Sequence, residues 1–115
     1  MIEYWEQIGY TPCTTFWQDF SIADAFVGVE LHPVEDTYKR AMEYAKTDYK
    51  YMTELVLVMN HKICQWYQVS PTRSILYDRL WRDAEEKFFE LFENNEEAVH
   101  YYYLLRGYGL VASWS

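Results

Sequence analysis

The 115-residue chain is poor in cysteine, glycine and long apolar runs. Its two cysteines, Cys13 and Cys64, form neither a metal-spaced pair nor a disulfide framework, which favours a reducing, cytoplasmic setting. Only four glycines occur, and none belongs to a phosphate-binding motif. The run from Leu55 to Met59 is far shorter than a membrane span. The first 12 residues lack the pattern of a signal peptide.

Basic residues are also scarce, because 10 Lys and Arg face 18 Asp and Glu, for a net charge of −8. Proteins that bind nucleic acid use Lys and Arg to displace counterions from phosphates, so direct contact with DNA or RNA is not expected. Anionic membrane surfaces are disfavoured for the same reason. The balance favours a protein partner with a basic surface.

Aromatic side chains, by contrast, are abundant, at 20% of the residues with 12 Tyr. This is more than a core of this size readily buries, so we expect some rings at the surface. Tyr and Trp combine an apolar body with a polar tip, which suits interfaces.

The stretch 49–67 predicts the central helix, because its middle is apolar at every helical angle, as in a helix buried on several sides. Apolar residues keep one helical phase from Val34 to Trp66. Thr47 and Asp48 interrupt this region, and both residues prefer caps to helix interiors. We expect two helices, about 34–46 and 48–68, and one kinked helix is the alternative.

Three further helices are expected around it. The first lies in 14–28, with a capping box from Thr15 to Gln18 and Gly28 after its last turn. The second begins at Ser70-Pro71 and runs to about residue 92. Its apolar seam consists of Tyr77, Trp81, Ala84, Phe88 and Leu91.

Asn95 caps the last predicted helix, which turns Val99, Tyr102 and Tyr103 inward and ends at Arg106-Gly107. No segment shows the alternation of a strand. The sequence therefore predicts an all-α single domain over 1–115: a bundle of four or five helices around the helix at about 48–68, with a leader over 1–12 and a tail over 108–115.

Four segments also carry a resemblance to a known group. They are residues 14–24 (TTFWQDFSIAD), 36–41 (DTYKRA), 49–56 (YKYMTELV) and 76–81 (LYDRLW). This pattern resembles small helical accessory proteins carried on conjugative elements and prophages of gut anaerobes. The resemblance implies a mobile genetic element as the setting, and it implies no chemistry.

Glu54, His61 and Cys64 on the central helix are the candidates for a small enzyme, as an acid and a Cys–His pair. The alternative is structural: a hydrogen-bonded Glu54 with Lys50 or a tyrosine as partner, a core Cys64, and His61 on a less buried side with Asn60, Lys62 and Gln65. Glu97 and His100 have the Glu-x-x-His spacing of di-iron bundles, but no second motif accompanies them. We expect no enzyme activity, metal or cofactor.

The candidate partner-binding residues form an acidic stripe on the last two helices. Its members recur at helical spacing and are Asp83, Glu86, Glu90, Glu93, Glu96 and Glu97. Arg79, Arg82 and Lys87 are placed to neutralise its first half. The stripe is either a solvated outer face or a surface that meets a basic partner. The second interpretation predicts a non-enzymatic interaction module of a mobile element, such as a nucleic-acid mimic that inhibits a restriction or CRISPR protein. The alternative is a self-associating structural or regulatory accessory protein, a homo-oligomer in contact through its aromatic surface.

Overall fold

The computed structural model describes residues 14–26 and 32–114, with side chains described as far as Arg106. Five α-helices fill these ranges, which contain no strand, so the all-α prediction is confirmed. The helices are α2 (Phe16–Phe26), α3 (His32–Ala45), α4 (Tyr49–Trp66), α5 (Pro71–Phe92) and α6 (Glu96–Trp114).

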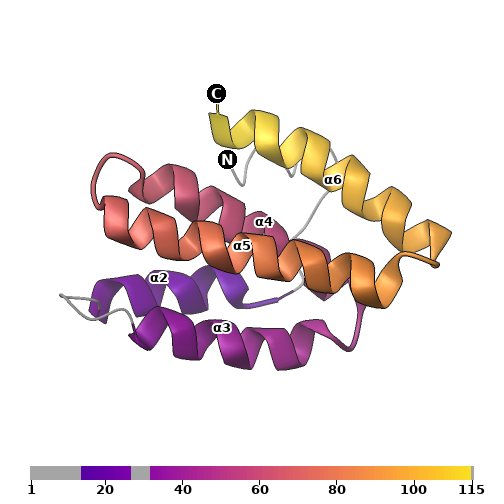
Figure 1. Cartoon of the computed structure of the whole chain (residues 1–115), viewed down its shortest axis with the longest axis horizontal. Helices are drawn as coiled ribbons and strands as arrows, with labels where there is room; N and C mark the ends of the chain where they lie inside the picture. Colours follow the sequence, from indigo (N-terminus) through magenta and orange to yellow (C-terminus); the bar gives the residue numbers. More distant parts are fainter. Residues whose placement is uncertain (1–13, 27–31, 115) are drawn as a thin grey trace.

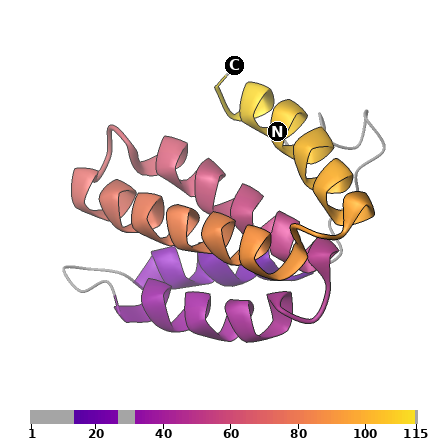
Figure 2. The same ribbon diagram turned by 45° about the vertical axis from the view of Figure 1, so that its right-hand side comes forward.

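Helix α4 is the centre of the bundle, as predicted, because it contacts α2, α3, α5 and α6. The α2–α3 pair lies on one side of the α4–α5 pair, and α6 lies on the other (Figures 1 and 2). Every residue from 52 to 60 is buried, which explains why the run from Leu55 to Met59 is apolar at every helical angle. Among the described residues, no helix is long and apolar enough to cross a bilayer.

The helix boundaries follow local capping chemistry. The α3–α4 region is two helices, because Asp48 adopts an extended backbone and its side chain accepts a hydrogen bond from the Lys50 amide. Ser70 caps α5 in the same way, with Pro71 at the first helical position. The side chain of Asn95 accepts a hydrogen bond from the Ala98 amide at the start of α6. These three predicted boundaries are confirmed.

Two predicted termini are wrong. Thr15 forms no capping box with Gln18; its hydroxyl donates to Asp19, and the Thr14 hydroxyl accepts from the Phe16 amide. Helix α6 does not end at Arg106-Gly107 but continues to Trp114, because an interior glycine costs only about 1 kcal/mol. The predicted leader over 1–12 and the cap at Gly28 lie outside the described residues.

Two side chains predicted to face the core are exposed. Leu91 is 47% exposed because it lies in the last turn of α5, and Tyr103 is 52% exposed. Tyr102 takes the inward position on α6 instead, with Ala98 and Leu105 on the same face. A helix turns about 100° per residue, so adjacent tyrosines cannot both face the core.

Candidate functional site

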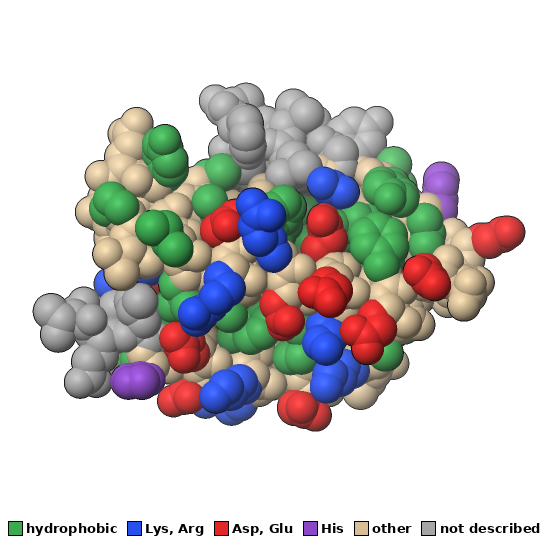
Figure 3. Space-filling model, in the orientation of Figure 1, with side chains coloured by type: hydrophobic (Ala, Val, Ile, Leu, Met, Phe, Trp, Pro, Cys, Tyr) green, Lys and Arg blue, Asp and Glu red, His purple; other side chains and the backbone are tan. Residues whose placement is uncertain are grey.

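The acidic stripe lies on the outer face of α5. Glu86, Glu90 and Glu93 are exposed, whereas Phe88 on the same helix is fully buried. At about 100° per residue, the three carboxylates lie about 140–200° around the helix from Phe88. They therefore point away from the core. Figure 3 shows acidic side chains gathered towards the right of one face, over α5 and its turn into α6.

The stripe continues onto the first turn of α6, where Glu96 and Glu97 are exposed. Their charge is favourable there, because the amino-terminal end of a helix carries a partial positive charge. Glu97 accepts a hydrogen bond of 3.0 Å from the Tyr49 hydroxyl, which links α6 to α4. We call Glu86, Glu90, Glu93, Glu96 and Glu97 the acidic corner.

Asp83 does not belong to the acidic corner, because it has a structural partner. It is half-buried and accepts a 2.5 Å hydrogen bond from the Tyr38 hydroxyl of α3. Burial, together with this bond to a carboxylate, raises the pKa of Tyr38 above its usual range. Asp83 thus joins α5 to α3.

The local neutralisation predicted for the stripe is largely wrong. Arg79 pairs with Glu35 of α3 at 3.3 Å, and Arg82 pairs with Asp78 at 3.0 Å. Lys87 lies 3.7 Å from Glu90 rather than beside Asp83. Within the described part of the chain, the other four carboxylates of the acidic corner form no ion pair. In the acidic corner, Glu90 rather than Glu86 is therefore the carboxylate with a basic neighbour.

A cluster of aromatic side chains from α5 and α6 lies next to the acidic corner. The Phe88 ring stacks on Tyr102 with centroids 4.4 Å apart, and Phe89 contacts both Tyr102 and Tyr103. The Tyr102 hydroxyl donates to Glu85, which also lies 3.5 Å from Arg106. These contacts join α5 to α6 next to the acidic corner.

The three enzyme candidates are spread along α4. Glu54 is 0% exposed and accepts a 2.8 Å hydrogen bond from the Thr14 hydroxyl, whereas the predicted partner Lys50 is exposed. His61 follows seven residues later, about 10.5 Å along the helix axis. Burial, with a contribution from Lys62, lowers the pKa of His61 to about 4. Cys64 is half-buried. The described residues contain no group of three metal-ligating side chains.

A buried ionic cluster was missed by the sequence interpretation. Lys62, predicted on a less buried side with Asn60, is only 3% exposed, and Asn60 is buried too. The Lys62 ammonium lies 3.0 Å from the Asp24 carboxylate of α2, and Arg73 of α5 lies 4.0 Å from it. Both cations are buried near Asp24, so this carboxylate contributes to the compensation of their charge.

Asp24 also accepts two neutral hydrogen bonds. The Tyr77 hydroxyl donates at 2.7 Å and the Trp66 indole at 3.0 Å. Burial and the bond to Asp24 raise the pKa of Tyr77 above its usual range. One carboxylate therefore joins α2, α4 and α5, which indicates a structural role.

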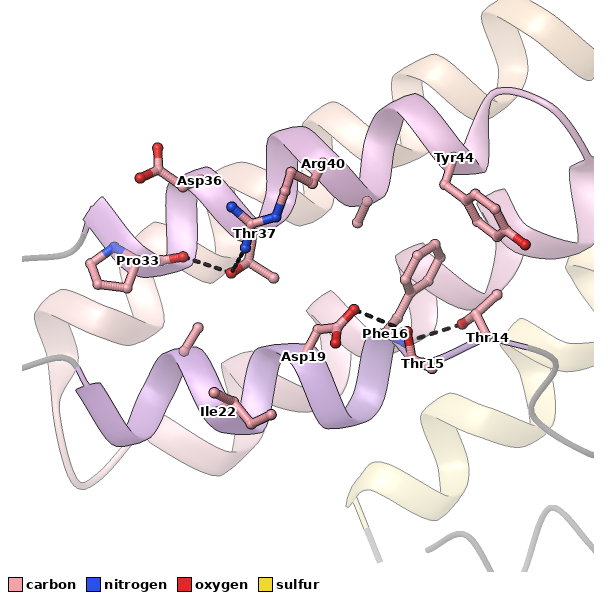
Figure 4. Close-up of a pocket in the computed structure, with 12 residues that line it drawn as sticks. Thr14, Thr15, Phe16, Asp19, Ile22, Pro33, Asp36, Thr37, Arg40 and Tyr44 are labelled. Carbon is pink, nitrogen blue, oxygen red and sulfur yellow. Dashed lines mark hydrogen bonds between the residues drawn. The ribbon is translucent and has the colours of Figure 1, made fainter.

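A hollow of about 1030 Å³ lies between α2 and α3 (Figure 4). Its buried lining consists of Phe16, Ala23, Thr37 and Ala41, and the two alanines leave space between the helices. Exposed apolar side chains stand on both walls, Ile22 on α2 and Tyr44 on α3. No sequence motif marked this hollow, because it arises from the packing of two helices.

Polar groups line the same hollow on both sides. Asp19 on α2 points towards α3, and Arg40 on α3 lies beside Thr37 (Figure 4). The Arg40 guanidinium donates to the Thr37 hydroxyl at 3.2 Å. Within the described residues, neither Asp19 nor Arg40 forms an ion pair. Asp36 also lines the α3 wall, and its carboxylate points away from α2 (Figure 4). The charged groups on the walls are thus the Asp19 carboxylate on α2 and, on α3, the Arg40 guanidinium beside this outward-pointing carboxylate.

No protein-family model, curated protein or solved structure matches this chain.

Proposed function

We propose that the chain is a non-enzymatic protein-interaction module that binds a basic protein surface through the acidic corner. The observation that carries this proposal is the exposure of all five carboxylates on the outer faces of α5 and α6. Surface charge of one sign accelerates encounter with an oppositely charged partner and selects against others.

The partner in this proposal is a nucleic-acid-handling defence protein, of the restriction or CRISPR type. The proposal places the chain on a mobile genetic element, following the resemblance of its sequence. A row of carboxylates on a helix presents negative charge to a surface that otherwise holds phosphates. The chain acts as a competitive mimic and needs no catalytic group.

The test is a pulldown from a host lysate followed by competition. The protein retained on the immobilised chain is challenged with duplex DNA or RNA, which should release it. Glu90→Lys with Glu93→Lys should abolish retention, because the double reversal changes the charge of the corner by four. Glu43→Lys with Gln18→Lys and Gln68→Lys is the matched control, since it also changes the charge by four at exposed positions, outside both the acidic corner and the hollow between α2 and α3. Retention that is unchanged by the α5 reversal, or unaffected by nucleic acid, contradicts the mimic.

A second candidate function, a self-associating accessory protein, is supported by the α4–α5 turn. Tyr67, Val69 and Ile75 are 69–71% exposed there, more than any other described large apolar side chain. Clustered apolar exposure marks interaction surfaces. Light scattering over a range of concentrations tests it: association that Ile75→Glu reverses supports this function, and a monomer at every concentration removes it.

A further inference from the structure

The hollow between α2 and α3 has the form of a short binding groove. The helices are antiparallel, because the ring centroids of Phe16 and Tyr44, at the start of α2 and the end of α3, lie 6.2 Å apart. From Thr15 to Ile22 the α2 wall advances about 10.5 Å. An extended peptide advances about 3.3 Å per residue, so the groove accommodates about three or four residues.

The charges on the walls restrict what fits. Asp19 calls for a basic group on the α2 side, and Arg40 calls for an acidic group on the α3 side. Successive side chains of an extended peptide point in opposite directions. A basic residue directly followed or preceded by an acidic residue therefore meets both walls at once.

The apolar parts of the groove define the flanking positions. Ile22 is 49% exposed on one wall and Tyr44 is 52% exposed on the other, so each offers apolar surface to a ligand. Ala23 and Ala41, on the floor, let a peptide backbone approach closely. Sites of this size typically combine apolar walls with a few polar groups that set orientation.

We propose that the α2–α3 groove binds a short extended peptide segment of a partner protein, in which adjacent basic and acidic residues are flanked by apolar ones. The volume of about 1030 Å³ exceeds what one amino acid fills, which favours a peptide over a small zwitterion. The groove and the acidic corner share no residue, so the proposal for the groove does not depend on whether the corner binds a basic partner.

The test is an NMR titration of the ¹⁵N-labelled chain with four blocked tetrapeptides. The probe is acetyl-Leu-Arg-Glu-Leu-amide, and the others replace Arg, Glu or both by Gln. The full probe should shift the amides of Asp19, Ala23, Arg40 and Ala41. Each neutral replacement should weaken binding about tenfold, which corresponds to one charge-assisted hydrogen bond.

Matched variants separate the groove from general charge effects. Arg40→Gln should lower the affinity for the probe peptide about tenfold, and Arg40→Lys should retain part of that affinity. Lys39→Gln is the control, since Lys39 is the exposed basic neighbour on α3 and does not line the groove. Three results would overturn the proposal. The first is an absence of chemical-shift changes at the groove residues. The others are an affinity equal to that of the full probe, either for the doubly neutral peptide or for free arginine and glutamate.

Discussion

Asp24 and the acidic corner use the same chemical group in opposite ways. Asp24 is 8% exposed and holds two cations, a tyrosine and a tryptophan. The five carboxylates of the corner are exposed, and only Glu90 lies near a cation within the described residues. Because a buried charge must be compensated and an exposed one is hydrated, the first position determines stability and the second is free to evolve for binding.

The largest effect is expected at Asp24. Asp24→Asn keeps the shape of the side chain but leaves Lys62 and Arg73 buried without their carboxylate. Breaking a buried ion pair in this way costs about 3–5 kcal/mol. Urea unfolding should show this loss, whereas Asp19→Asn, the same change at a more exposed position of α2, should cost less than about 1 kcal/mol.

A second substitution tests whether charge is the cause. Asp24→Asn combined with Lys62→Met removes one of the stranded cations, so it should recover part of the lost stability. If the double variant is no more stable than Asp24→Asn alone, the interpretation of Asp24 as an ionic hub is wrong.

A smaller effect is expected from Tyr77→Phe, which removes one hydrogen bond to Asp24 and leaves the ring in place. Bonds to charged groups contribute about 1.5–3 kcal/mol, so the loss of unfolding free energy should lie near the lower end of that range. Tyr49→Phe removes the bond to the exposed Glu97 and should cost less. If Tyr77→Phe and Tyr49→Phe lose the same amount of unfolding free energy, a hydrogen bond to a buried carboxylate is not worth more than one to an exposed carboxylate, and the contrast is wrong.

The contrast between buried and exposed groups extends to His61 and predicts a pH dependence. The folded chain has a His61 pKa of about 4, below the unfolded value of 6.5. As pH falls from about 6.5 towards about 4, the unfolded state gains a proton that the folded state does not, so stability falls in this window. Urea unfolding measured across this pH range should show that the unfolding free energy changes less steeply with pH in His61→Gln than in the native chain. Parallel slopes would show that His61 is not desolvated.

The smallest effect on stability is expected from Glu90→Lys with Glu93→Lys. Exposed sites of this kind change the unfolding free energy within about 0.5 kcal/mol. If the acidic corner binds a basic partner, the same variant should lose about tenfold or more in affinity, and added salt should weaken the native complex. A large loss of unfolding free energy would show that Glu90 and Glu93 have a structural role, as Asp24 does.

Much of the fold was predictable because its signals are local. Asp48, Ser70 and Asn95 each accept a hydrogen bond from an amide two or three residues onward, so their neighbours in the sequence suffice to identify them. The apolar stretch of α4 likewise predicts its own burial. The end of α6 was missed because Gly107 was interpreted as a stop, although nothing at this position requires one.

The ionic cluster and the groove were not predictable in this way. Asp24 and Lys62 are separated by 38 positions, and each looks like an ordinary polar residue of an amphipathic helix. The groove depends on small side chains, Ala23 and Ala41, that lie on two different helices. Helical periodicity predicts which face of its helix a residue occupies. The residue that it contacts on another helix depends on how the helices pack.

The contact of α4 with every other helix also determines how the domain opens. Detachment of α2, α3 or α6 alone leaves α4 packed against α5, its most extensive neighbour. Amide protons near Leu55 to Met59 therefore reach water only when the whole bundle unfolds, whereas those of a peripheral helix exchange through smaller openings. Hydrogen exchange in α4 thus reports the global free energy of unfolding.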